Sequence, residues 1–232
     1  MPNFDTGKLK LFLLERLKPG ELQRTLLMAA IIGVAGALAT IGFRLAITGL
    51  EQLFLGRSDS LVQAAIGLPW WQRLLYPALG GICAGLLLQT LSDRLTNNKN
   101  SDYMEAITLG DGSLNTRQSL IRAGSSALSV ASGSSIGREG SMVQLAALMG
   151  SLIGRWRCTS KPKLRLLVAC GAAAGITAAY NAPLAGALFV AEIVLRSVAI
   201  DSLGPLLVAS VMANLTVHQF FGFGPAYHMP VF

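Results

Sequence analysis

The sequence carries one charged pair between glycines in a stretch of small and apolar residues. Arg138 and Glu139 stand between Gly137 and Gly140, and Ser141 follows them. A charged side chain inside a bilayer is costly, and such residues mark binding sites or ion paths. The chemistry of this pair therefore depends on whether the elements that position it lie in a membrane.

The composition indicates that they do. Of the 232 residues, 52% are hydrophobic and 13% are charged, whereas about 25% of the residues are charged in an ordinary soluble domain. The 25 glycines suit helices that pack closely in lipid. The net charge of +7 comes from Lys and Arg residues between apolar segments, without the interleaved aromatic residues of a nucleic-acid surface. We expect an all-α, multi-pass protein of the lipid bilayer with no nucleic-acid partner.

The first part of the chain predicts its orientation. Residues 1–24 mix basic, acidic and apolar side chains, which favours an amphipathic helix on the cytoplasmic surface of the membrane. Long apolar segments follow from residue 25 to about 54 and from about 71 to 91. Five Lys or Arg residues precede these segments, one separates them and two follow, which places the N-terminus in the cytoplasm. We expect the transmembrane region to cover residues 25–222, with a tail at 223–232.

Past residue 100 the apolar segments are shorter than the roughly 20 residues that cross a bilayer. Gly, Pro and polar residues separate five of them, at 101–109, 119–131, 142–153, 164–179 and 183–195. This pattern predicts broken or re-entrant helices. Non-helical backbone at membrane depth must be enclosed by protein or line a wet cavity. The breaks therefore predict a permeation or binding site.

Enzyme motifs are missing from the sequence. It has no phosphate-binding lysine loop, no His/Glu metal pair and no Ser/His/Asp set that would place a nucleophile beside a base. We therefore expect neither an enzyme nor a cofactor.

The central loop has the features of an anion site. We expect a helix to begin at Ser141, and a helix start carries about half a positive charge and unpaired N–H groups. Ser101 would bring a hydroxyl and a second helix start to the same place. The Glu139 carboxylate is itself an anion, so it would block the site when ionised and release it when protonated. The alternative is a packing pair with Arg138.

These residues resemble a known family. The run Gly137-Arg138-Glu139-Gly140-Ser141 is similar to the GREGP motif of the CLC chloride channel and transporter family, and residues 171–175 and 180–192 are similar to its GAAAG and NAPLAG…F..E stretches. The resemblance covers essentially residues 25–225. It implies a bacterial inner-membrane protein of broken and re-entrant helices, the first of two inverted repeats, that forms a homodimer with one anion pathway per subunit.

The resemblance also implies roles for single residues. Glu139 falls on the gating glutamate of the family, inside the motif that contains Gly137 and Arg138. The amides of Gly140, Ser141 and Met142 fall on the outer anion site. Ser101 falls on the serine of the GSGIP motif, although the glycines and the proline of that motif are not kept here.

Two departures bear on the mechanism. Proton-coupled members of the family have a second glutamate directly after the position of Glu192, and this chain has Ile193 there. Isoleucine cannot carry a proton, so channel-like conduction is favoured, with Glu192 or water as a possible proton path for an exchanger. The second half of the family fold, with its GxFxP loop and late tyrosine, does not follow in this sequence. A gated chloride pathway is the first hypothesis, and the alternatives are a transport-inactive half that acts as a remnant or assembly partner, and a Cl⁻/H⁺ exchanger.

Overall fold

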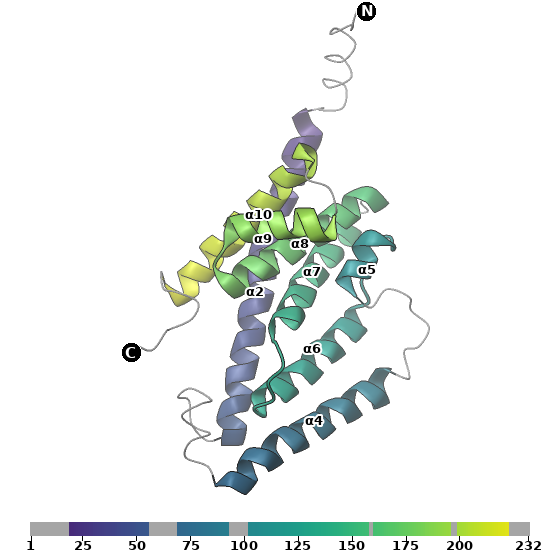
Figure 1. Cartoon of the computed structure of the whole chain (residues 1–232). Helices are drawn as coiled ribbons and strands as arrows, with labels where there is room; N and C mark the ends of the chain where they lie inside the picture. Colours follow the sequence, from purple (N-terminus) through teal and green to yellow (C-terminus); the bar gives the residue numbers. More distant parts are fainter. Residues whose placement is uncertain (1–18, 56–68, 93–101, 158–159, 196–198, 223–232) are drawn as a thin grey trace, which may run out of the picture.

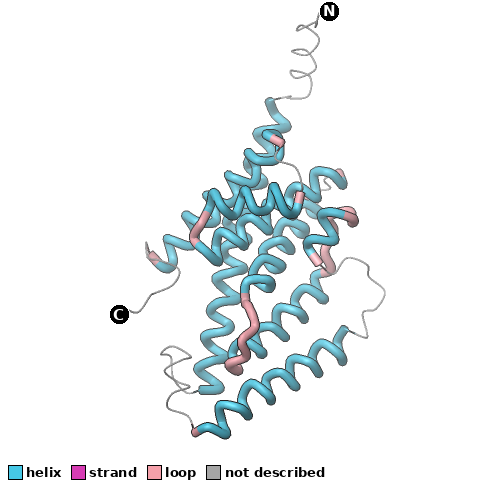
Figure 2. Tube along the Cα trace, viewed as in Figure 1, coloured by secondary structure: helices cyan, strands magenta, loops and turns pink. Residues whose placement is uncertain are grey.

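The computed structural model describes residues 19–55, 69–92, 102–157, 160–195 and 199–222, and every regular element in these ranges is a helix (Figures 1 and 2). The elements are α2 (Pro19–Leu55), α4 (Trp70–Ser92), α5 (Tyr103–Thr108), α6 (Thr116–Ala131), α7 (Glu139–Trp156), α8 (Lys161–Tyr180), α9 (Pro183–Phe189), the π-helix η2 (Val190–Val194) and α10 (Ile200–Phe221). The all-helical expectation is therefore confirmed. Of the surface helix predicted over residues 1–24, residues 1–18 lie outside the described residues and residues 19–24 belong to α2. The tail at 223–232 and Ser101 also lie outside the described residues.

Within the described ranges, three helices are long and apolar enough to cross a membrane, over Gly20–Leu53, Lys161–Tyr180 and Asp201–Phe221. The apolar segment predicted over residues 25 to about 54 lies within α2, which begins at Pro19, a residue well suited to the first helical turn. One bound corrects the sequence-based expectation. The segment at 164–179 was expected to fall short of a crossing, but α8 is 20 residues long, since the polar residues at its start continue the helix.

Two of the predicted breaks give short helices, one before α6 and one after α8. Helix α5 has six residues and α9 has seven. Asn181 ends α8 in the left-handed conformation, with φ 54°, and its N–H donates to the Thr177 carbonyl oxygen. Pro183 then opens α9, because its fixed φ suits a first turn and it needs no hydrogen bond there. The chain therefore turns sharply between a long helix and a short one.

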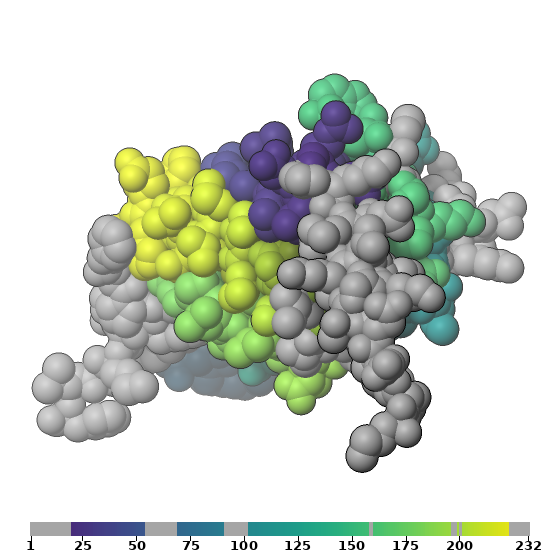
Figure 3. Space-filling view, turned by 90° about the horizontal axis from the view of Figure 1, so that it is seen from above, coloured from purple at the N-terminus to yellow at the C-terminus, as the bar shows by residue number. Residues whose placement is uncertain are grey.

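Small residues bring α7 and α8 into close contact at the centre of the bundle. A side-chain carbon added at Gly171 would collide with the Ala146 carbonyl oxygen, and one added at Gly175 would lie 2.8 Å from the Val143 Cα atom. In the same way, Gly33 of α2 faces the Ala209 carbonyl oxygen of α10. The space-filling view from above agrees, with the start of α2 beside α10 (Figure 3). This packing holds the start of α7 in a fixed place.

Candidate functional site

Helix α7 begins at Glu139, with Arg138 as its N-cap residue, two residues before the expected start at Ser141. An acidic residue is favoured in a first turn because it faces the positive end of the helix dipole, and glycine at the second position does not end the helix. Glu139 is therefore part of the helix start rather than of the loop.

The helix uses one of the predicted donors. The Met142 N–H donates to the Arg138 carbonyl oxygen at 3.3 Å, and the Met142 side chain is buried. The predicted set therefore loses the Met142 amide, because that amide takes part in the helix. The Met142 N–H is the first donor within the helix, so the amides without an acceptor inside α7 are those of Glu139, Gly140 and Ser141.

The Glu139 side chain turns back toward the preceding loop. A side-chain carbon added at Gly137 would lie 2.7 Å from the Glu139 Oε2 atom. Glycine at residue 137 thus leaves room for the carboxylate beside the backbone. Glu139 itself is half-buried, whereas Gly137 and Gly140 are exposed.

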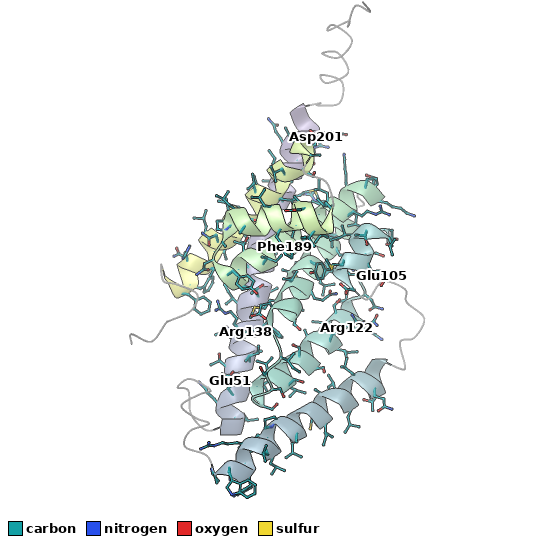
Figure 4. The ribbon with its side chains drawn as sticks, viewed as in Figure 1. Glu51, Glu105, Arg122, Arg138, Phe189 and Asp201 are labelled. Carbon is teal, nitrogen blue, oxygen red and sulfur yellow. The ribbon has the colours of Figure 1, made fainter. Side chains whose placement is uncertain are left out.

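Glu139 lines a pocket of about 510 Å³. Helix α7 contributes Glu139, Gly140 and Val143 to its wall. The other lining residues come from α5, from the end of α8 and from α9 with the residue before it, namely Tyr103, Ile176, Tyr180, Ala182, Ala185, Gly186 and Phe189. Figure 4 labels Phe189, which lies on α9 across the upper part of the bundle. The pocket is therefore mostly apolar, with a carboxylate, a helix start and two phenols as its polar groups.

Arg138 is not among the described residues that line this pocket. Its positive charge acts on Glu51, near the end of α2, and the two residues lie in the same lower part of the bundle in Figure 4. Among the predicted anion-binding residues, Gly140 lines the pocket. Gly137 and Arg138 directly precede α7 in the chain.

Hydrogen bonds between helices fix the start of α5 against α7. The Tyr103 N–H donates to the Gln144 Oε1 atom at 3.1 Å, and the Gln144 Nε2 atom donates to the Ser119 hydroxyl at 3.0 Å. Asp102 caps α5 by accepting from the Met104 N–H at 3.0 Å. Sequence reasoning missed Tyr103 and Gln144, although a glutamine inside the apolar run 142–153 was a signal.

Glu192 lies apart from this pocket. It belongs to the π-helix η2, its side chain is exposed, and it is not among the described residues that line the pocket. The neighbouring Ile193 is also exposed, at 46%. Among the described residues, the lining of the Glu139 pocket thus includes the predicted gate but not the predicted proton-path residue Glu192.

Comparisons with known proteins identify the family of this chain. A family described as "Voltage gated chloride channel" matches residues 80–232. The chain is 56% identical to a putative chloride channel protein ClcB-like of Ralstonia nicotianae over 211 residues, which cover 89% of this chain and 49% of that protein. It is 48% identical to the voltage-gated ClC-type chloride channel ClcB of Citrobacter koseri over 204 residues, which cover 86% of this chain and 48% of that protein.

A solved structure has the same fold. The crystal structure of a slow cyanobacterial Cl⁻/H⁺ antiporter matches with a TM-score of 0.68 and 25% identity, over 87% of this chain and 48% of the antiporter. The chain thus spans about half the length of the relatives it matches. On the family match and these identities, the chain belongs to the voltage-gated chloride channel (CLC) family.

Proposed function

We propose that this chain supplies the glutamate-gated part of a pathway that carries chloride across the bacterial inner membrane, with its N-terminus in the cytoplasm. The observation that carries the proposal is the position of Glu139, whose carboxylate lines a mostly apolar pocket at the start of an 18-residue helix. A monovalent anion and the carboxylate would compete for that helix start, because both are favoured by its dipole and its unpaired N–H groups.

Protonation of Glu139 would open the pathway. The positive helix end attracts a neutral carboxyl group less strongly than a carboxylate. The protonated side chain therefore moves away from the helix start, and the anion binds there instead. The match to chloride channels at 56% and 48% identity supports chloride as the transported ion.

Channel-like conduction is the form of transport that we favour. Ile193 has no titratable proton, and the exposed Glu192 is not among the described residues that line the Glu139 pocket. Coupled Cl⁻/H⁺ exchange is the second candidate, and the similarity to a Cl⁻/H⁺ antiporter favours it. The two candidates predict different proton movements.

Chloride flux into liposomes tests both. We expect wild-type flux to rise as the pH falls, because protonation releases the Glu139 block. Glu139→Gln and Glu139→Ala should give high flux that no longer depends on pH. Glu105→Gln is the matched control, since Glu105 is an exposed carboxylate of α5 away from the pocket lining. Proton counter-movement in a fixed ratio to chloride would overturn the channel-like form.

The flux assay should use two forms of the protein. One is the 232-residue chain, and the other is this chain joined to the remaining half of the Ralstonia nicotianae relative. Cross-linking in the membrane would test the expected homodimer. Flux in either form that responds to Glu139 substitution supports the proposal, whereas no flux in both forms would leave the assembly-partner alternative.

A further inference from the structure

Tyr103 lines the Glu139 pocket and has a polar side chain to which the proposed function assigns no role. It is the first residue of α5, its ring is half-buried, and it packs against the hydrophobic cluster between α7 and α8. It also lines the pocket together with Glu139 and Gly140. The ring is therefore held on one side by the core, while part of the residue faces the pocket.

The backbone of Tyr103 is fixed from α7. Its N–H donates to the Gln144 Oε1 atom at 3.1 Å, and Gln144 is only 7% exposed. Gln144 lies just over one turn after Glu139 on the same helix. The gate residue and the first residue of α5 are thus positioned by one helix, so a rigid-body change of α7 would move both.

The Tyr103 hydroxyl has no hydrogen-bond partner among the described residues. A buried or half-buried phenol normally finds an acceptor. The phenol of tyrosine has an ordinary pKa near 10, so its hydroxyl is a donor at neutral pH. Most of the pocket wall is apolar, with Val143, Ile176 and Phe189 among its residues, so few side chains of the wall can donate a hydrogen bond to an anion.

We propose that the Tyr103 hydroxyl is a direct donor to an anion held in the Glu139 pocket, so that α5 contributes a side chain to the binding site begun by α7. This inference rests on the proposed function. It adds Tyr103 to the residues that bind the anion. The start of α7 would supply backbone N–H donors, and Tyr103 would supply a neutral side-chain donor. The ligand class is a monovalent anion such as chloride or bromide.

Calorimetric titration of the purified protein with chloride tests the proposal. Loss of a hydrogen bond to a charged partner lowers the binding free energy by an amount that corresponds to about tenfold weaker binding. We expect Tyr103→Phe, which keeps the ring, to weaken chloride binding by about that factor. Tyr76→Phe is the matched control, because Tyr76 lies on α4 and is not among the described residues of the pocket lining.

Further variants separate the possible failures. Tyr103→His keeps a ring and restores a donor, so it should regain part of the affinity that Tyr103→Phe loses. Unchanged chloride affinity in Tyr103→Phe, together with a changed affinity in Glu139→Gln, would overturn this inference and leave the proposed function standing. If the wild-type protein binds no chloride, both the role of Tyr103 and the proposed function are overturned.

Discussion

The Glu139 carboxylate occupies space that only a glycine leaves open. Residue 137 has no side chain, and the carboxylate lies close to the place where a side-chain carbon would stand. The same carboxylate lines the pocket and sits in the first turn of α7. At the scale of single residues, the proposed gate would need space beside the backbone for the ionised side chain as much as it needs the side chain itself.

Gly137→Ala should disturb that resting place without unfolding the protein. The added carbon would lie 2.7 Å from Glu139 Oε2, so the flexible carboxylate must move while the backbone stays. We expect chloride flux at neutral pH to rise several-fold, toward that of Glu139→Gln. Flux assays on Gly137→Ala should be compared with Gly42→Ala, whose added carbon meets nothing within 4 Å. Flux and pH dependence identical to wild type would contradict this account of the gate.

At the scale of elements, one glutamine joins three helices. Gln144 of α7 accepts from the first N–H of α5 and donates to the Ser119 hydroxyl of α6. Ser119 is fully buried and Gln144 nearly so. Buried polar groups of this kind are costly when their partners are removed, so the contact fixes where the short helix α5 stands.

Gln144→Met should loosen α5. Methionine has a similar length, but its sulfur is only a weak acceptor for the Tyr103 N–H and it has no donor for Ser119. The buried Ser119 hydroxyl and the part-buried Tyr103 N–H therefore lose their partner. We expect the free energy of unfolding to fall by about 1–3 kcal/mol, with faster hydrogen exchange at the Tyr103 amide. Gln89→Met, on an exposed face of α4, should leave both unchanged. Equal exchange rates at the Tyr103 amide in the two variants would show that Gln144 does not hold α5.

The sequence predicts helices better than it predicts their ends. Composition and glycine-separated apolar runs were enough for an all-helical membrane fold with a short helix after residue 181. The start of α7 was placed two residues late, because Glu139 looks like a loop residue although a helix start favours it. Tyr103 and Gln144 could not be paired from the sequence, since 41 positions separate them and only the tertiary packing brings them together.

At the scale of the whole molecule, the ends of the bundle are distinct. The starts of α2 and α8 meet where Lys163 Nζ and Glu21 Oε2 lie 3.3 Å apart, and Asp201 at the start of α10 lies at the same end in Figure 4. The start of α4 lies at the opposite end, beside the end of α2 (Figure 1). Exposed tryptophans occur at both ends, with Trp156 82% exposed and Trp70 75% exposed. Tryptophans are typical of the two membrane interfaces.

This arrangement predicts which residues face each side of the membrane. We proposed a cytoplasmic N-terminus from the basic residues that precede α2, and in that orientation the Lys163–Glu21 contact would place the start of α8 in the cytoplasm as well. In a cysteine-free background, Lys161→Cys should react with a membrane-impermeant maleimide only in inverted vesicles. Trp70→Cys should react in intact cells, because α4 begins at the other end of the bundle. Labelling of both positions from one side would contradict the bundle orientation, since a helix the length of α2, at 37 residues and about 1.5 Å per residue, separates them.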